Sequence, residues 1–407
     1  MAKHKRPLFV ALALLVIVAL VNWLVPETRA SASQASDLQL VAVGLNNPRG
    51  LAFDGSEDRL LVAEAGSGGS APCFAGPEGE TCLGTSGAIA RVEVSSGSVV
   101  RLVTGLPSLG LADPPGFNAT GPHDIARIGD DEYYVAIGLG GSPLVRASLG
   151  AGANLLGHVV RVRSGGTPQS LTDLTGFEAA NDVDGAGVDS NPYALALRAD
   201  RLFAVDAGAN TLVAIDSAGR TQVATMLPSR LVAAPSFIQP PPPEGQIPMQ
   251  AVPNSAAVGP DGAIYIGELT GFPFPVGGAN VYRIGANGEA ELYASGFTNI
   301  IAIDFDRQGN LYVLEIAKDG LLAATEGPPT GRLVRVDRGS KAQTVIASER
   351  LIAPAGLLVG QSAIYISNFG VFPGQGQIVR IERGGRHSPA LVLHHRNDRR
   401  NALRAPG

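Results

Sequence analysis

The stretch QAVPNSAAVGPDGAIYIGELTGFPFPVGGANVYRIGANGEAELYASGF (residues 250–297) decides the fold, because it holds four short apolar runs separated by turns. Two of those turns, Gly-Pro-Asp-Gly (259–262) and Gly-Ala-Asn-Gly (285–288), carry the residues that tight turns prefer. Short runs rich in Ile, Val and Tyr between glycine turns predict an antiparallel meander. A unit of about 45 residues with four strands has the size of a β-propeller blade.

Five further copies of the first two strands occur along the chain. They are NPRGLAF…RLLVAEAG from Asn47, GPHDIARIGDDEYYVAIG from Gly121, NPYALALRADRLFAVDAG from Asn191, TNIIAIDFDRQGNLYVLEI from Thr298 and APAGLLVGQSAIYISNFG from Ala353. Each copy is followed by a third-strand motif such as QIVRIER or RLVRVDR. The sequence therefore predicts an all-β protein, a six-bladed β-propeller of four-stranded antiparallel blades over residues 37–383.

Two segments compete to close the ring. DLQLVAVGL (residues 37–45) has the pattern of a fourth strand without a blade of its own, and it leads directly into the first blade. SPALVLHH (residues 388–395) stands at fourth-strand spacing after the last third strand. We expect closure by the N-terminal strand, which would join the first blade to the last and remove exposed edges. Residues 384–407 then form a basic C-terminal tail.

The first 32 residues have the pattern of an export signal. Lys3, Lys5 and Arg6 precede an apolar run over residues 8–25, and Ala30-Ser31-Ala32 fits a cleavage site. The run is also long enough to remain as an N-terminal membrane anchor, so residues 1–32 are either a signal peptide or a tether. Both alternatives predict a secreted or cell-envelope protein. The net charge of −5 argues against a general nucleic-acid binder.

The two cysteines of the chain stand in one Gly/Pro-containing loop, CFAGPEGETC. In an oxidising compartment, Cys73 and Cys82 predict a disulfide that closes this loop, with two free thiols as the alternative.

Long connections occur only between the second and third strands of a blade or between blades. In an antiparallel meander both kinds emerge on one face of the ring. We therefore expect binding or chemistry on this loop-rich face.

Residues at two positions of the repeat are expected to meet there. The ends of the second strands are Glu64, Ile137, Asp206, Glu268, Glu315 and Asn368; the starts of the first strands are Arg49, His123, Tyr193, Asn254, Ile300 and Ala355. Carboxylates gathered around one channel would repel one another unless a positive charge neutralises them. One hypothesis is a site for calcium or another divalent cation at Glu64, Asp206, Asn254 and Glu268. The alternative that we favour is that the carboxylates cap backbone N–H groups and pair with arginines.

His123 is the candidate catalytic residue, as a general base of the kind that lactone hydrolysis uses. Adjacent residues of a strand point to opposite faces, so Asp124 cannot orient His123. A histidine that lines the channel is therefore the preferred interpretation. The sequence contains no G-x-S-x-G, H-E-x-x-H or phosphate-loop motif.

The loop EAANDVDGAGVDSNPY (residues 178–193) concentrates Asp182, Asp184 and Asp189 among glycines. It is similar to a calcium loop but lacks a bidentate Glu at EF-hand spacing. Asx turns that cap the loop's own backbone are the alternative.

Several of these segments together resemble one family. GLNNPRGLAF, PCFAGPEGETC, ATGPHDIA, EAANDVDGAGVDSNPYAL, GELTGFPFPVGGANVYR and SGFTNIIAIDF look like the ScyD/ScyE family, exported bacterial proteins named for genes found with scytonemin pigment biosynthesis. The resemblance covers residues 38–382 and implies a six-bladed, TolB-like propeller, but it implies no reaction. More distantly, the chain is similar to gluconolactonases and strictosidine synthase-like proteins.

We therefore expect a monomeric propeller that binds a small molecule or a protein on its loop-rich face, without defined catalysis. The alternative is a metal-dependent hydrolase or lactonase of the gluconolactonase-like type. A quinone-dependent sugar dehydrogenase is a weaker third hypothesis, since fold analogy alone supports it.

Overall fold

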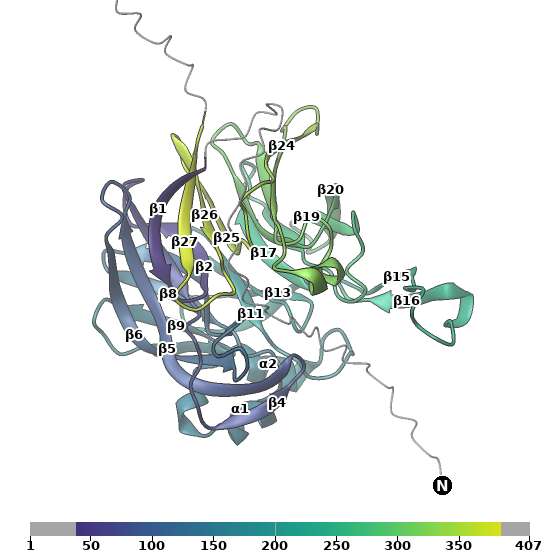
Figure 1. Cartoon of the computed structure of the whole chain (residues 1–407), viewed down its shortest axis with the longest axis horizontal. Coiled ribbons are helices and arrows are strands. Elements are labelled where there is room, and N and C mark those ends of the chain that lie inside the picture. The colour runs from purple at the N-terminus through teal and green to yellow at the C-terminus, as the bar shows by residue number, and fades with distance from the viewer. Residues whose placement is uncertain (1–37, 200, 384–407) are drawn as a thin grey trace, which may run out of the picture.

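The computed structural model describes residues 38–199 and 201–383, which form six four-stranded antiparallel sheets arranged as the blades of a propeller (Figure 1). The predicted fold class is confirmed. The predicted leader (residues 1–32), the competing strand at residues 388–395 and the basic tail (residues 384–407) lie outside the described residues.

Each blade follows the same strand order from the centre outward. The first blade is β2 (Pro48–Phe53), β3 (Arg59–Glu64), β5 (Gly79–Glu93) and β6 (Val99–Leu111); the second is β7 (Pro122–Gly129), β8 (Glu132–Ile137), β9 (His158–Arg163) and β10 (Gln169–Asp173). The third is β11 (Pro192–Arg198), β12 (Arg201–Asp206), β13 (Thr211–Ile215) and β14 (Thr221–Met226); the fourth is β17 (Pro253–Val258), β18 (Ile264–Glu268), β19 (Ala279–Ile284) and β20 (Ala290–Phe297). The fifth is β21 (Ile300–Phe305), β22 (Leu311–Glu315), β23 (Arg332–Val336) and β24 (Gln343–Ala347), and the sixth begins with β25 (Gly356–Val359), β26 (Ala363–Asn368) and β27 (Gly376–Glu382).

The N-terminal strand β1 (Gln39–Leu45) completes the sixth blade, as predicted. It runs antiparallel to β27, with Gln39 opposite Arg380 and Leu45 opposite Gly376. In Figure 1 the purple start of the described chain therefore lies beside its yellow end. This pairing gives the last blade its fourth strand and closes the ring.

The hydrophobic core lies between the blades. Six buried clusters form, one at each interface between neighbouring blades. At the interface of the first two blades, for example, Leu61 and Ile89 pack in one cluster with Val135 and Ile137. Each sheet therefore buries both faces against its neighbours, which explains why the strands are apolar along their length.

Several predicted loops contain secondary structure of their own. The cysteine loop forms a hairpin of β4 (Cys73–Gly76) with the extended β5, and the predicted Cys73–Cys82 disulfide is present. Directly after the fourth strand of the second blade, the segment LTGF begins helix α2 (Leu174–Asn181), because Asp173 accepts a hydrogen bond from Gly176 N (2.9 Å) and caps the helix.

Other insertions are smaller. Helix α1 (Pro143–Ser148) and the 3-10 turn η1 (Ala151–Ala153) join β8 to β9, and η3 (Leu321–Glu326) joins β22 to β23. A hairpin of β15 (Arg230–Ala233) and β16 (Gln246–Met249), which includes the turn η2 (Pro243–Gly245), projects from the body in Figure 1. Across residues 38–199 and 201–383, the helices are too short or too polar to cross a lipid bilayer.

Candidate functional site

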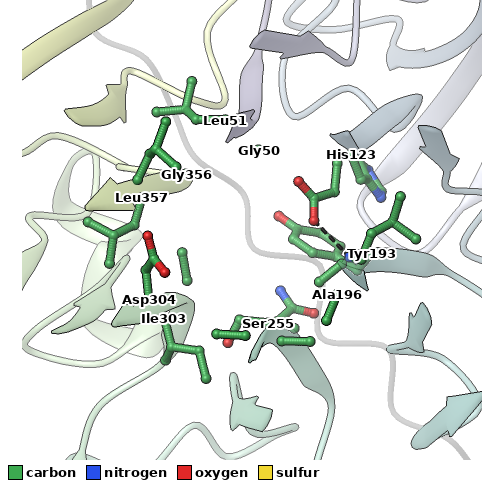
Figure 2. Close-up of a pocket in the computed structure, with 18 of the residues that line it drawn as sticks. Gly50, Leu51, His123, Tyr193, Ala196, Ser255, Ile303, Asp304, Gly356 and Leu357 are labelled. Atoms are coloured by element: carbon green, nitrogen blue, oxygen red, sulfur yellow. Dashed lines mark hydrogen bonds between the residues drawn. The ribbon is translucent and has the colours of Figure 1, made fainter. Parts of the chain in front are cut away.

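A cavity of about 220 Å³ lies at the centre of the ring and is lined by the first strands of all six blades (Figure 2). These inner strands contact one another around the axis, for example β11 with β17 and β17 with β21. Four of the residues predicted at the starts of the first strands line this cavity: His123, Tyr193, Asn254 and Ala355. These four residues therefore lie at the central cavity, and their role in ligand binding stays a prediction.

Arg49 and Ile300, the two other residues predicted at the starts of the first strands, are not among the residues that line the cavity. The guanidinium of Arg49 is buried and donates to Ala119 O (2.8 Å) and Asn118 Oδ1 (3.2 Å). Ile300 is fully buried in the core between the fourth and fifth blades.

His123 is the most unusual side chain of the cavity wall. It is 2% exposed, and its Nδ1 lies 3.1 Å from the carbonyl oxygen of Pro192. A carbonyl oxygen only accepts hydrogen bonds, so Nδ1 carries the proton and Nε2 presents a lone pair. That Nε2 is buried and has no hydrogen-bond partner in the described protein. Burial, with a contribution from the nearby charge of Arg49, lowers the pKa of His123 to about 3.

Tyr193 lies against His123, with the two ring centroids 4.5 Å apart and the planes tilted by 36°. Figure 2 shows the tyrosine ring extending from the side of β11 toward the open centre of the cavity. Gly138 makes this arrangement possible, because a Cβ there would come within 2.2 Å of the His123 ring. Together the two rings form an aromatic wall with one unsatisfied acceptor.

Asp124 does not contact the free nitrogen of His123, in agreement with the alternation of side chains along a strand. Its carboxylate accepts hydrogen bonds from Leu195 N (2.7 Å) and Ile125 N (2.8 Å) and so joins the second blade to the third. A Cβ on Gly50 would lie 2.0 Å from Asp124 Oδ1, so glycine leaves the space for this carboxylate. Burial raises the pKa of Asp124 to about 7.

Asp304 has the same function between the fifth and sixth blades. It accepts from Val359 N (2.7 Å) and Phe305 N (2.7 Å), and burial raises its pKa to about 6. In Figure 2 it lies across the cavity from His123 and Tyr193. Sequence reasoning missed Asp304; the available signal was an Asp inside an otherwise apolar first strand.

Three strand-end glutamates are paired with arginines. Glu64 accepts two hydrogen bonds from Arg101, both at 2.8 Å, and Glu315 accepts two from Arg332, at 2.6 and 2.8 Å. Glu268 accepts one from Arg230 of the β15–β16 hairpin at 2.5 Å.

The same side chains hold the backbone that enters the blade. Glu64 accepts from Asn46 N (2.8 Å) and Glu315 from Thr298 N (2.9 Å), while the amide oxygen of Asn368 accepts from Ile352 N (2.7 Å). None of these side chains is among those that line the central cavity in the described part of the chain. The geometry matches the capping and arginine-pairing alternative, and a cation site at Glu64, Asp206, Asn254 and Glu268 stays a prediction.

Asp206, at the strand end of the third blade, has the same backbone contact but no arginine. It accepts from Asn191 N (2.6 Å) and from Ser190 Oγ (2.6 Å), and burial raises its pKa to about 6. Glu178 lies nearby, and burial together with the negative charges of Asp206, Asp184 and Asp182 raises its pKa to about 7. The third blade therefore concentrates negative charge at its loop-rich end.

Comparison with known proteins shows no family for this chain. No family model and no curated protein matches the chain. Among solved structures, a structural-genomics protein of unknown function from Bacteroides thetaiotaomicron is 13% identical, with coverage of 86% of this chain and 73% of that one and a TM-score of 0.49.

Two enzymes are similarly distant. Virginiamycin B lyase from Staphylococcus aureus is 13% identical, with 86% and 99% of the two chains covered and a TM-score of 0.45. Aldose sugar dehydrogenase from Streptomyces coelicolor, in its PQQ-bound form, is 14% identical, with 85% and 98% covered and a TM-score of 0.49. With TM-scores below 0.5 and identities of 13–14%, these likenesses carry no functional argument, so the functional inference has to come from the site.

Proposed function

We propose that this protein is an exported propeller of the ScyD/ScyE type that binds a small, neutral, hydroxyl-bearing ring compound at the His123–Tyr193 wall of the central cavity. The six motifs quoted above support the family, and the Cys73–Cys82 disulfide supports an extracellular or cell-envelope location. We further propose a monomer that carries its ligand site on the loop-rich face.

One observation carries the proposal, the buried lone pair of His123 Nε2 without a protein partner. Buried polar atoms are almost always hydrogen-bonded, so such an atom at a cavity wall marks a place where a donor from outside the chain is bound. A ligand hydroxyl can donate to it.

The size and chemistry of the cavity define the ligand class. A volume of about 220 Å³ is below the usual range of drug-sized pockets, about 300–1,000 Å³, and therefore suits a single ring. The face of Tyr193 offers stacking to a flat or sugar ring. The buried carboxyls of Asp124 and Asp304 favour a neutral ligand over an anion.

Binding fits His123 better than proton abstraction does. A general base works best with a pKa near the operating pH. A pKa of about 3 makes His123 a weak base at neutral pH but leaves it a competent hydrogen-bond acceptor.

The test is binding of three defined probes to the purified full chain: glucose, glucono-δ-lactone and indole-3-ethanol. We expect at least one probe to raise the melting temperature in a concentration-dependent way. His123→Asn should weaken that binding about tenfold, the value of one buried hydrogen bond, and Tyr193→Ala should weaken it further. Tyr134→Phe changes a tyrosine of the same propeller outside the cavity and should bind as the unmodified protein does.

Failure of all three probes at millimolar concentration, or binding that neither cavity variant weakens, would contradict the proposal. The same samples test the alternative function, since lactone consumption can be followed alongside binding. Turnover of glucono-δ-lactone that a chelator abolishes would replace the binding proposal by the metal-dependent hydrolase.

A further inference from the structure

A compact acidic cluster lies where helix α2 ends, outside the central cavity. Glu178 is in the helix, Asp182 is its C-terminal cap in the left-handed conformation (φ 39°), and Asp184 follows two residues later. One carboxylate oxygen from each of the three lies within 4.8 Å of the others. Among the described residues, this is the one group of three or more acidic, histidine or cysteine side chains with that spacing.

Glu178 gives independent evidence that something binds here. Its side chain is 2% exposed, and its Oε1 is buried without a hydrogen-bond partner in the described protein. A carboxylate oxygen that is removed from water and left unpaired destabilises the fold unless a positive group meets it. Glu178 also contributes a carboxylate oxygen to the cluster, so its unpaired Oε1 points to a cation there.

No side chain supplies that positive charge. Within residues 38–199 and 201–383, no arginine, lysine or histidine forms an ion pair with Glu178, Asp182 or Asp184, nor with the neighbouring Asp189 and Asp206. The strand-end glutamates of the first, fourth and fifth blades, by contrast, each have an arginine. The acidic cluster is therefore an uncompensated negative charge in a protein that otherwise compensates its buried glutamates.

The loop fixes the positions of two of the carboxylates. Asp182 Oδ1 accepts from Gly187 N (3.1 Å). Asp184 Oδ1 accepts from Ala186 N (2.8 Å), and its Oδ2 accepts from Asn210 Nδ2 (2.7 Å). Each oxygen keeps a further lone pair, so these contacts orient the ligands and leave them able to coordinate.

We propose that Glu178, Asp182 and Asp184 bind one calcium ion. Hard oxygen ligands from carboxylates suit Ca²⁺, whose six to eight positions carbonyl groups and water complete without strict geometry. The sequence contains the set as E-x-x-x-D-x-D, with the glutamate one helical turn before the first aspartate. The glutamate thus precedes the loop, whereas an EF-hand places it at the end.

The position of the ion suggests what it stabilises. The loop leads into Asn191, whose backbone N–H is bound by Asp206, and then into Pro192, whose carbonyl oxygen binds His123. The ion would hold this segment to α2 and, through Asn210, to the third blade. It would brace the wall of the cavity without entering it.

The test is calorimetric titration of the chelator-stripped full chain with CaCl₂ alone, combined with thermal unfolding. We expect one Ca²⁺ per chain and a melting temperature that rises by about 4 °C at a calcium concentration 100-fold above Kd. Glu178→Gln keeps the shape and removes the charge, so it should weaken calcium binding at least tenfold. In EGTA the same variant should melt above the unmodified protein, because an unpaired buried charge is gone.

Asp337→Asn is the matched control. Asp337 also caps its own loop, by accepting from Gly339 N (3.1 Å) and Ser340 N (2.9 Å), but it is not part of the acidic cluster. It should bind calcium as the unmodified protein does. Asp184→Asn is a second cluster variant in case Glu178→Gln does not fold. No calcium binding at millimolar concentration, or equal binding in the cluster variants, would overturn the proposal, as would an equal loss in Asp337→Asn. The outcome does not depend on whether the central cavity binds a ring compound.

Discussion

At the loop-rich ends of the third and fifth blades, a buried carboxylate has different partners. In both, a carboxylate at the end of the second strand binds the backbone that enters the blade. In the fifth blade Arg332 neutralises Glu315 through two hydrogen bonds. In the third blade Asp206 has no arginine; it accepts from Ser190 Oγ and Ala209 N and has further carboxylates nearby.

Both blades share the hydrogen bond from the carboxylate to the backbone, but they differ in how the carboxylate charge is neutralised. In a blade with an arginine, another residue of the chain neutralises that charge. The third blade requires a proton or an external cation to reach the same balance. The third blade thus departs from the others at a position where five of the six copies have a polar residue.

The largest effect is expected on removing an arginine from a balanced blade. Arg332→Met would leave the fully buried Glu315 without its partner and should lower the free energy of unfolding by about 3 kcal/mol. Urea unfolding at pH 7 measures this loss. Arg335→Met, which breaks a more exposed pair with Asp337, should cost less than about 1 kcal/mol. Equal losses would mean that burial of the glutamate does not determine the cost.

A smaller, pH-dependent effect is expected in the unbalanced blade. The pKa of Asp206 is about 6 in the fold against 3.8 normally, so the folded state binds its proton more tightly than the unfolded state does. Stability from this group is therefore present at low pH and is lost as pH rises through 6. Between pH 4.5 and 7.5 the unmodified protein should lose about 2 kcal/mol relative to Asp206→Asn. Urea unfolding in EGTA at both pH values tests this, and a constant or opposite difference would contradict it.

The smallest effect is expected at Ser190. Ser190→Ala removes a hydrogen bond of 2.6 Å to Asp206, which is mostly ionised at pH 7, and should cost about 1.5 kcal/mol by the same assay at pH 7. Ser340→Ala, at an exposed hydroxyl that also binds an aspartate, should change stability by less than about 0.5 kcal/mol. A loss at Ser190 as large as that of Arg332→Met would remove the distinction between the two blades.

The fold was predictable because each blade repeats the same local pattern. Turns such as 259–262, alternating with apolar runs, set the strands, and the orphan fourth strand at the N-terminus indicated the closure. Helix α2 was not predicted. Its N-cap, Asp173, stands at the end of a strand, so the preference of aspartate for a helix cap is hidden within a strand pattern. The disulfide followed from the presence of only two cysteines.

The site was predictable in part, because the first-strand starts of the repeat register placed His123, Tyr193 and Asn254 at the cavity. The repeat pattern could not predict which residues from distant parts of the chain contact these side chains. Arg230, which pairs with Glu268, comes from the projecting hairpin, and the contact of His123 is a backbone carbonyl of the next blade. The importance of Glu178 depended on its burial, which no sequence pattern revealed.

The pairing of β1 with β27 has a consequence for the order of folding. The two strands stand at opposite ends of the described chain, so the ring cannot close until nearly all of it has been synthesised. Contacts between residues so distant in sequence form late and slow the reaction. Until β1 arrives, the outer edge of β27 in the sixth blade is unpaired.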